Sequence, residues 1–420
     1  MRRSSLYYTL GLLTLLVAGI YSCKKVNGIN NNTVVETPYS LYFTDTSGTL
    51  FVSTDGKNIS LVFPADGKPC RAIVTSGDNI LWAKDKLYFS DNNGVNFNHS
   101  FDSLNSISMF DFGATGIGLT GPGSVAVNGL PIDFNQSMLI TPPSWGGRVY
   151  AVTYAKELNN GSINYLGIVH SDGQGRPGTW GTDGYDSIIG GVLGAGKLPV
   201  NITSLTQLAN GYLCGLAYEN DAVITASTRA NRIRYVRNFY KAAKDENPGD
   251  KWREVTSNPD AVTSWPTGHG VNQLPPHLGT PDTSFFTLGH LNNRLIAIDR
   301  KGEYGAWYSD DYGANWSKYS GLPAGIPLMC ISAPFEQVCL IGTDSAGLYM
   351  LNQNTGSWQQ SNSGLSNNLV VRNITFKETI YKNGTVKKYV YLATNMGIYQ
   401  STDGGMNWIR TIPGNYVGIY

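Results

Sequence analysis

Two segments of the chain decide its fold, Ser309-Asp310-Asp311-Tyr312-Gly313-Ala314-Asn315-Trp316 and Ser401-Thr402-Asp403-Gly404-Gly405-Met406-Asn407-Trp408. Both follow the pattern Ser-x-Asp-x-Gly-x-x-Trp. Looser copies occupy residues 53–56, 90–97 and 352–358, and the loosest joins residues 170–173 to Trp180. Recurrence of one short pattern along a chain indicates a repeat architecture, in which each copy belongs to one supersecondary unit.

The chemistry of this pattern is that of a tight turn. The Asp accepts hydrogen bonds from backbone N–H groups, Gly adopts a left-handed conformation, and Trp packs back between neighbouring sheets. The pattern resembles the Asp-box, or bacterial neuraminidase repeat, of sialidase-type β-propellers. We therefore interpret Asp310 and Asp403 as structural and not as catalytic acids. The residues assigned to the two turns are Ser309, Asp310, Gly313, Trp316, Ser401, Asp403, Gly405 and Trp408.

Pairs of short apolar runs precede these turns and predict strands packed on both faces. The second run of each pair lies at 40–43, 80–83, 148–151, 212–215, 294–297, 337–340 and 389–392. Seven blades of about 45 residues need roughly 315 residues. The surplus forms insertions at 113–147, between the first two strands of blade 3, and at 184–202 and 256–283, between blades. The resemblance and these runs predict an all-β fold, a single seven-bladed β-propeller over 39–420.

The end of the chain supplies a further strand. Asn415-Tyr416-Val417-Gly418-Ile419-Tyr420 has no following turn, and the first sheet, which starts near Tyr39, lacks an innermost strand. We predict that the two segments pair. This pairing would close the ring and remove an exposed sheet edge.

Composition agrees with many short strands and excludes one class of partner. The chain has 420 residues, of which 49 are Gly and 25 are Tyr, and its formal net charge is +1. Abundant Gly supplies the positive φ angles of tight turns. Nucleic-acid binding requires a strongly basic face, so the near-neutral charge argues against a nucleic-acid partner.

The first residues predict export. Arg2 and Arg3 precede the apolar run 10–20, which is too short to span a bilayer and is typical of a secretory signal. Ile20-Tyr21-Ser22-Cys23 resembles the lipobox of bacterial lipoproteins, with an ordinary signal peptide as the alternative. The resemblance implies a signal peptide over 1–22, lipidation of Cys23 and a flexible tether over 23–38. Lys24 and Lys25 stand where Bacteroidetes-type surface-export signals have acidic residues, which favours an outer-membrane anchor that faces the periplasm.

The remaining cysteines suit an oxidising compartment. Cys330 and Cys339 flank Pro334-Phe335 symmetrically, so a hairpin with a two-residue turn would place them opposite each other as a candidate disulfide. Cys70 and Cys214 are interpreted as buried thiols. No zinc-ligand spacing occurs, and no metal or cofactor is predicted.

Two of the insertions carry the candidate ligand-binding residues, Asp183, Tyr185, Asp186, Trp265, His269 and His277. Aromatic rings beside carboxylates suit a carbohydrate, because the apolar face of a sugar stacks on a ring while its hydroxyls are hydrogen-bonded. The alternative is that Trp265 anchors its loop and the acids cap turns. The basic segment 229–244 is interpreted as a solvated strand neutralised by the acids that follow it.

These features favour a lipid-anchored, monomeric, non-catalytic module of the cell envelope that binds a glycan or a protein. No Arg-Ile-Pro motif occurs, so the arginine triad of sialidases is not assigned. A Trp followed by Ser-Gly-Leu, at 316–322 and 358–365, is similar to repeats of photosystem II assembly-factor-like and sortilin-like proteins, which bind proteins. The alternatives are a glycoside hydrolase or lyase that uses loop carboxylates and an envelope assembly factor.

Overall fold

The structure, a computed structural model, describes part of the chain. The described residues are 35–68, 70, 72–76, 78–84, 87–100, 139–140, 149–152, 156–157, 163–164, 168–171, 173–182, 200–209, 213–219, 231–236, 253–254, 286–311, 316–335 and 337–420. Every regular element in these ranges is a β-strand. The described residues divide between two compact units, one formed by 35–39 together with 377–388, the other by the described parts of 40–376 and 389–420.

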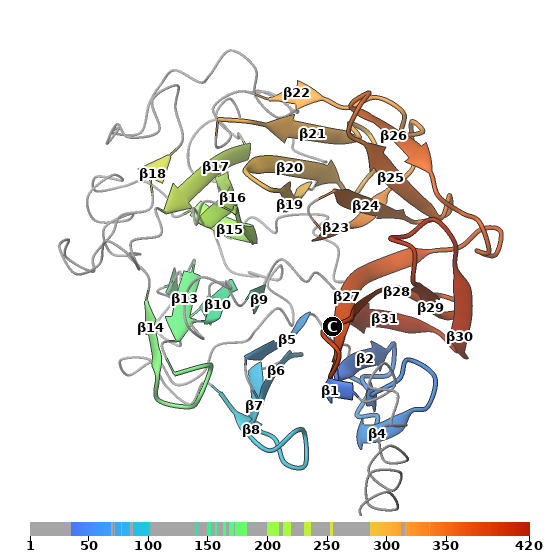
Figure 1. Cartoon of the computed structure of the whole chain (residues 1–420). Helices are drawn as coiled ribbons and strands as arrows, with labels where there is room; N and C mark the ends of the chain where they lie inside the picture. Colours follow the sequence, from blue (N-terminus) through green and yellow to red (C-terminus); the bar gives the residue numbers. More distant parts are fainter. Residues whose placement is uncertain are drawn as a thin grey trace, which may run out of the picture. The chain divides into compact units, whose positions relative to one another are not determined.

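Seven antiparallel sheets of four or five strands account for most of the described residues (Figure 1). The first three sheets, in spatial order, are β31 (Tyr416–Ile419), β2 (Leu41–Asp45), β3 (Leu50–Ser53) and β4 (Ser60–Phe63); β5 (Ala72–Ser76), β6 (Asn79–Ala83), β7 (Leu87–Ser90) and β8 (Asn98–His99); and β9 (Leu139–Ile140), β10 (Val149–Val152), β13 (Ile168–Ser171) and β14 (Trp180–Thr182).

Four further sheets follow along the chain. They are β15 (Val200–Gln207), β16 (Leu213–Glu219), β17 (Asn231–Val236) and β18 (Arg253–Glu254); β19 (Phe286–Leu291), β20 (Arg294–Asp299), β21 (Ala306–Ser309) and β22 (Ser317–Lys318); β23 (Leu328–Phe335), β24 (Val338–Thr343), β25 (Leu348–Asn352) and β26 (Ser357–Gln360); and β1 (Val35–Thr37), β27 (Val371–Tyr381), β28 (Val386–Thr394), β29 (Gly397–Ser401) and β30 (Ile409–Pro413). A separate hairpin joins β11 (Lys156–Glu157) to β12 (Ile163–Asn164).

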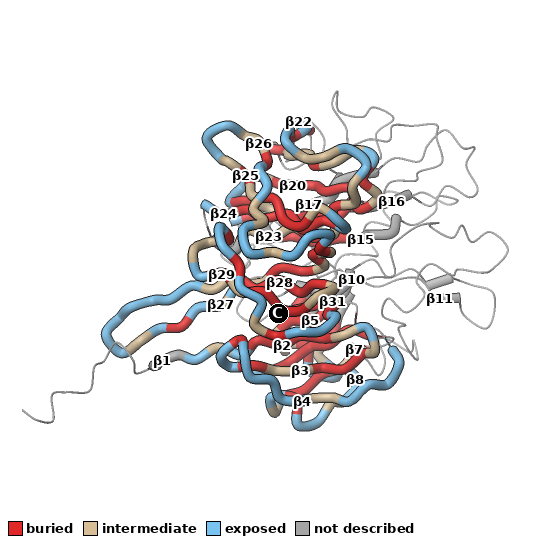
Figure 2. Tube along the Cα trace, turned by 90° about the vertical axis from the view of Figure 1, so that its right-hand side faces the viewer, coloured by how far each residue is buried: buried red, intermediate tan, exposed pale blue. Residues whose placement is uncertain are grey.

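Each of the seven predicted apolar runs overlaps one strand of this set. Six of those strands lie second from one edge of a four-stranded sheet, and β28 lies third in the five-stranded sheet, after β1 and β27. Residues of β6, for example, are buried along the whole strand. The outer strand β30 is instead largely exposed. Figure 2 shows the same gradient from buried inner strands to exposed outer ones. An inner strand is covered on both faces, so its sequence is apolar without alternation.

The last strand of the chain pairs with the first sheet, as predicted. Phe43 lies opposite Ile419 and Thr44 opposite Gly418 in the β2–β31 ladder. The N–H of Tyr42 donates to the carbonyl of Tyr420 at 2.8 Å, and the N–H of Tyr420 donates back at 2.7 Å. This sheet therefore joins residues from both ends of the described chain.

Apolar side chains fill the space between successive sheets. One cluster combines residues of β20, β21, β24 and β25 with Tyr319 and Trp358. The next combines residues of β23 to β25 with β27 to β29 and with Trp408. Close packing of this kind between sheets is the main source of stability in such a fold.

Two boundaries differ from the predicted ones. Val35–Thr37, inside the predicted tether, forms β1 and pairs with β27, with Val35 opposite Tyr381. The predicted insertion 113–147 contains β9, the innermost strand of its sheet, which pairs with β10. The long segment 100–138 thus joins β8 to β9, between two sheets, and not the first two strands of one blade. A strand of two residues has too little apolar pattern to be identified from sequence.

The predicted disulfide between Cys330 and Cys339 is wrong, because both thiols are free and buried. The β23–β24 ladder pairs Cys330 with Gly342 and Phe335 with Val338, so the chain turns between Phe335 and Val338 and not at Pro334-Phe335. Cys330 packs in the cluster that includes β27 and β28, and Cys339 packs in the cluster that includes β20 and β21. The two side chains therefore point to opposite faces of the sheet. The prediction of a buried thiol at Cys70 is confirmed.

Candidate functional site

The six predicted ligand-binding residues, Asp183, Tyr185, Asp186, Trp265, His269 and His277, lie outside the described residues, as does Cys23. Within the basic segment 229–244, Asn231–Val236 forms β17. Its register places Arg234 opposite Glu254 of β18.

The repeated turn is a network of hydrogen bonds to one carboxylate. In the turn after β29, the hydroxyl of Ser401 donates to Oδ1 of Asp403 at 2.7 Å, and the N–H groups of Met406 and Asn407 donate to the same oxygen at 3.1 and 3.0 Å. The N–H of Gly405 donates to the Ser401 hydroxyl at 2.9 Å. Burial opposes ionisation of Asp403, but these hydrogen bonds outweigh it and lower its pKa. The carboxylate of Asp403 is thus hydrogen-bonded to groups of its own turn, as predicted.

In the other strict copy, the carboxylate of the turn is Asp311 and not Asp310. The hydroxyl of Ser309 donates to Oδ1 of Asp311 at 2.7 Å. Asp310 instead accepts two hydrogen bonds from the guanidinium of Arg294, at 2.7 and 2.9 Å. The same guanidinium lies over the ring of Tyr308, 4.4 Å from its centroid. The assignment of Asp310 to the turn is therefore corrected: Asp310 is a surface ion-pair partner, and the residue two after the Ser holds the turn.

Looser copies keep the same hydrogen bonds. Oδ1 of Asp55 accepts from the N–H groups of Lys57 and Asn58 at 2.8 Å each. Burial opposes the ionised form of Asp55, yet these bonds and those from its neighbours' side chains lower its pKa to about 2. In the second sheet Asn92 replaces the Asp and accepts from the Ser90 hydroxyl at 2.9 Å. Acceptor geometry, more than charge, is thus the shared feature of these turns.

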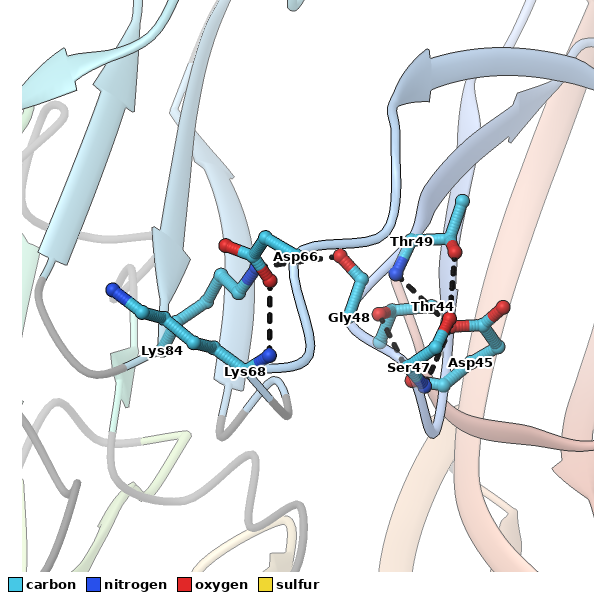
Figure 3. A network of polar contacts seen from close by, with 8 residues as sticks. All are labelled: Thr44, Asp45, Ser47, Gly48, Thr49, Asp66, Lys68 and Lys84. Atoms are coloured by element: carbon cyan, nitrogen blue, oxygen red, sulfur yellow. Dashed lines mark hydrogen bonds and ion pairs between the residues drawn. The ribbon is translucent and has the colours of Figure 1, made fainter.

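An ion pair between a buried lysine and a solvent-exposed aspartate joins the first two sheets (Figure 3). Lys84 follows β6, has a side chain that is 1% exposed, and forms an ion pair with Asp66. Its ammonium donates to the carbonyl of Gly48 at 3.3 Å and lies 4.3 Å from the centre of the Trp82 ring. Asp66 also accepts from the N–H of Lys68 at 3.0 Å. Every group in this network has a partner, so we interpret it as a junction between sheets. Sequence reasoning missed it, although a Lys directly after the apolar run 80–83 is a usable signal.

His290 lies between two inner strands. It belongs to β19, and its Nδ1 lies 2.8 Å from the hydroxyl oxygen of Thr206 on β15. Desolvation by burial lowers the pKa of His290, because the charged imidazolium is disfavoured in an apolar environment. This residue was not predicted, since a lone His in an apolar run carries no distinctive pattern. Among the described residues no three His, Cys, Asp or Glu side chains gather as a metal site.

A cavity of about 200 Å³ lies where β19, β23, β27 and β31 meet. Its polar lining comes from Thr287, Ser332, Arg372, Asn373 and Thr375, and the rest is mainly apolar. Arg372 donates to the carbonyl of Tyr416 at 3.1 Å, which links β27 to β31. Oδ1 of Asn373 and the hydroxyl of Thr287 are buried without a hydrogen-bond partner in the described structure. None of the described residues that line the cavity is an Asp, Glu or His.

Comparison with known proteins gives one similarity by sequence. No protein-family model matches the chain. A xyloglucanase of Paenibacillus sp is 26% identical over 206 residues, which cover 47% of this chain and 16% of that protein. The chain thus matches about a sixth of the length of that relative.

Many solved structures are also similar to this chain, and two of them serve as examples. YCF48 from Cyanidioschyzon merolae is 14% identical over 82% of this chain and 84% of its own, with a TM-score of 0.43. The GH74 xyloglucanase from Xanthomonas campestris is 10% identical over 90% of this chain and 46% of its own, with a TM-score of 0.33.

In the described part of the chain, no helix has the length and apolar character needed to cross a membrane.

Proposed function

We propose that the protein is an exported seven-bladed β-propeller, anchored to the cell envelope through lipidated Cys23, that binds a glycan or a protein partner without catalysing a reaction. In this proposal the seven sheets are the blades, and β31 closes the ring within the first blade.

Contacts between inner strands support the ring. β31 contacts β5, β5 contacts β9, β9 contacts β15, β15 contacts β19, and β19 contacts β23. The cluster that contains Trp408 joins β23 to β27, and Arg372 links β27 back to β31. This succession of contacts returns to the sheet in which it began. A closed array of sheets leaves few exposed edges, so it needs no further element to cover them.

The lining of the cavity between β19, β23, β27 and β31 supports a binding role for this part of the protein. Hydrolysis of glycosidic bonds generally requires two carboxyl groups about 5 to 10 Å apart in one cleft. The described lining has neither a carboxylate nor an imidazole, and the carboxylates of the repeated turns are bonded to their own backbone. Polar and apolar groups without an acid–base pair suit binding.

The ligand site is assigned to the long connections. Segments 183–199 and 255–285 each run from the outermost strand of one sheet to the innermost strand of the next. Strands alternate in direction within an antiparallel sheet, so both connections belong to the same end of the strands in a ring. Asp183, Tyr185 and Asp186 lie on one, and Trp265, His269 and His277 on the other. Long loops on a rigid scaffold are common binding sites.

A glycoside hydrolase or lyase is the second candidate. The similarity to a xyloglucanase over 206 residues favours it, because that name describes an enzyme that acts on xyloglucan. In this alternative, acids of the long connections would supply the catalytic pair.

A binding screen separates the two candidates. Residues 24–420 are mixed with polysaccharides, xyloglucan included, and the melting temperature is measured. We expect a stabilising glycan that is not cleaved, and we expect Trp265→Ala to abolish the stabilisation. Release of oligosaccharides that is lost in both Asp183→Asn and Asp186→Asn would establish the enzyme instead.

The anchor has its own test. The full chain is expressed in a bacterial host, and the N-terminal peptide of the membrane fraction is analysed by mass spectrometry. We expect a lipidated peptide that begins at Cys23, and none in Cys23→Ala. An unmodified N-terminus at another residue would contradict the anchor and leave the binding role intact.

A further inference from the structure

The outer ends of β27 and β28 form a basic hairpin. Residues 377–388 contain four lysines and one glutamate, which gives this segment a formal charge of +3 in a chain whose total is +1. Lys382, Lys387 and Lys388 are exposed. A formal charge of +3 on twelve residues makes this hairpin strongly basic.

One face of the hairpin also carries exposed apolar side chains. Lys388 forms an ion pair with Glu378 at 3.5 Å, which identifies these two residues as neighbours on one face. Side chains alternate along a strand, so Ile380 and Val386 share this face. They are 37% and 44% exposed. On the other face, the Lys387 ammonium lies 5.3 Å from the centre of the Tyr381 ring.

The tip of the hairpin is an ordered turn. The N–H of Tyr381 donates to the carbonyl of Thr385 at 2.9 Å, and the N–H of Gly384 donates to the carbonyl of Tyr381 at 2.8 Å. The side-chain amide of Asn383 donates to the Thr385 hydroxyl at 2.7 Å. Lys382 therefore stands at a defined, exposed position at the end of the hairpin. Figure 2 shows the exposed outer part of β27 and β28.

Strand β1 places this hairpin close to the proposed anchor. Val35 pairs with Tyr381 and Thr37 with Ile380, beside the tip. The segment from Cys23 to Val35 spans at most about 40 Å when fully extended. A chain held in the bilayer at Cys23 would therefore keep the tip within that distance of the lipid surface.

We propose that the hairpin 377–388 is a second membrane contact, in which Lys382, Lys387 and Lys388 bind anionic headgroups while Ile380 and Val386 enter the interface. This inference rests on the proposed anchor for its proximity, but its chemistry belongs to the hairpin. Basic residues beside exposed apolar ones are the combination that attracts a segment to an anionic bilayer.

Lysine reactivity in the full chain tests this contact. The protein is purified in a neutral detergent and reconstituted into vesicles of phosphatidylcholine alone or with phosphatidylglycerol. Lysines are acetylated with a water-soluble reagent and followed by mass spectrometry. On phosphatidylglycerol vesicles we expect acetylation of Lys382 and Lys387 to slow by at least about fivefold. The exposed residues Lys57 and Lys318 are internal controls and should react at unchanged rates.

Three results would overturn the proposal. Equal reaction of the hairpin lysines on both vesicle types would exclude recognition of anionic lipid. Protection already present in detergent would indicate that residues 1–34 or a second copy of the chain cover the hairpin. Protection of Lys57 and Lys318 to the same degree would indicate general shielding by the vesicle.

A variant pair separates charge from apolar contact. With acetylation of Lys388 as the readout, Lys382→Glu/Lys387→Glu should abolish the difference between the two vesicle types, whereas Lys57→Glu/Lys318→Glu should keep it. Ile380→Ser/Val386→Ser should reduce the protection of Lys382, while Ile409→Ser, which changes an exposed Ile of another strand, should not. The mass of the N-terminal peptide reports lipidation in the same samples. A lipidated chain without hairpin protection would contradict only this inference, and hairpin protection without lipidation would contradict only the anchor.

Discussion

The backbone of Gly364 lies directly against that of Trp408. The N–H of Trp408 donates to the carbonyl of Ser363 at 2.9 Å, and a Cβ atom on Gly364 would lie 2.0 Å from the Trp408 carbonyl oxygen. Gly321 stands in the same relation to Trp358, with a corresponding distance of 2.2 Å. In both cases the Ser-Gly-Leu segment after one sheet packs against the backbone of the Trp in the next sheet. This contact explains why the Ser-Gly-Leu segment and the turn motif recur together.

Gly364→Ala should destabilise the protein strongly. Its φ angle is +84°, and the added methyl would meet backbone that cannot move aside. Gly356→Ala is the matched control, because Gly356 has a φ angle of +65° but no atom within 4 Å of its Cβ position. We expect the free energy of unfolding to fall by at least about 2 kcal/mol more in Gly364→Ala than in the control. Equal losses in urea denaturation would show that only the φ angle matters.

Asp403→Ala should destabilise the last sheet. The change leaves the Ser401 hydroxyl and the N–H groups of Met406 and Asn407 without their acceptor, at a cost of about 1 to 3 kcal/mol. Asp344→Ala, at an exposed carboxylate in another turn, should cost less. Since the pKa of Asp403 is lowered in the folded state, its contribution is complete above pH 4 and is lost as the pH falls below about 4. Thermal unfolding of both variants at pH 7 and pH 3 checks this, and a penalty that does not shrink at pH 3 would contradict it.

Replacing Asp311 by Ala should reduce stability more than replacing the adjacent Asp310. Asp311→Ala removes the acceptor of the Ser309 hydroxyl within the turn and should reduce stability by about 1 kcal/mol or more. Asp310→Ala removes a surface ion pair with Arg294, which is worth about 0 to 1 kcal/mol and is screened by salt. Unfolding in low and high salt should therefore show a salt-dependent effect only for Asp310→Ala. The reverse ranking would restore Asp310 as the residue of the turn.

His290 should make stability depend on pH. Desolvation lowers its pKa in the folded state, so the unfolded chain takes up a proton first as the pH falls. The stabilisation is complete above about pH 6.5 and decreases below it, by at most about 1.4 kcal/mol per pH unit. His290→Gln should flatten the stability profile between pH 7 and pH 5, whereas His99→Gln, at an exposed position, should leave it unchanged. A profile that is identical in His290→Gln and the parent protein would contradict the prediction.

Cys330 and Cys339 should stay reduced in the folded protein. Burial raises the pKa of each thiol to about 12, so neither forms a reactive thiolate near neutral pH. Iodoacetamide should alkylate both only after unfolding, and a reducing agent should not change the melting temperature. Recovery of a Cys330–Cys339 disulfide peptide from an untreated sample would contradict the register of this hairpin.

The sequence by itself determined the all-β fold, the seven inner strands and the pairing of the last strand with the first sheet. These features depend on local patterns: apolar runs of four residues, turn residues at fixed spacing, and a terminal run without a turn. The turn chemistry of Ser401 and Asp403 was predictable for the same reason, because all of its hydrogen bonds lie within a few residues.

Only the tertiary structure decided which partner Asp310 bonds to, which faces the cysteines point to, and which polar groups are buried. Asp310 bonds to Arg294 on the neighbouring strand, and the turn between Phe335 and Val338 takes Cys339 out of the position opposite Cys330. Lys84 meets Asp66 and Gly48 only after two sheets pack together. These outcomes depend on strand register and on contacts between distant segments, and no local pattern encodes either of them.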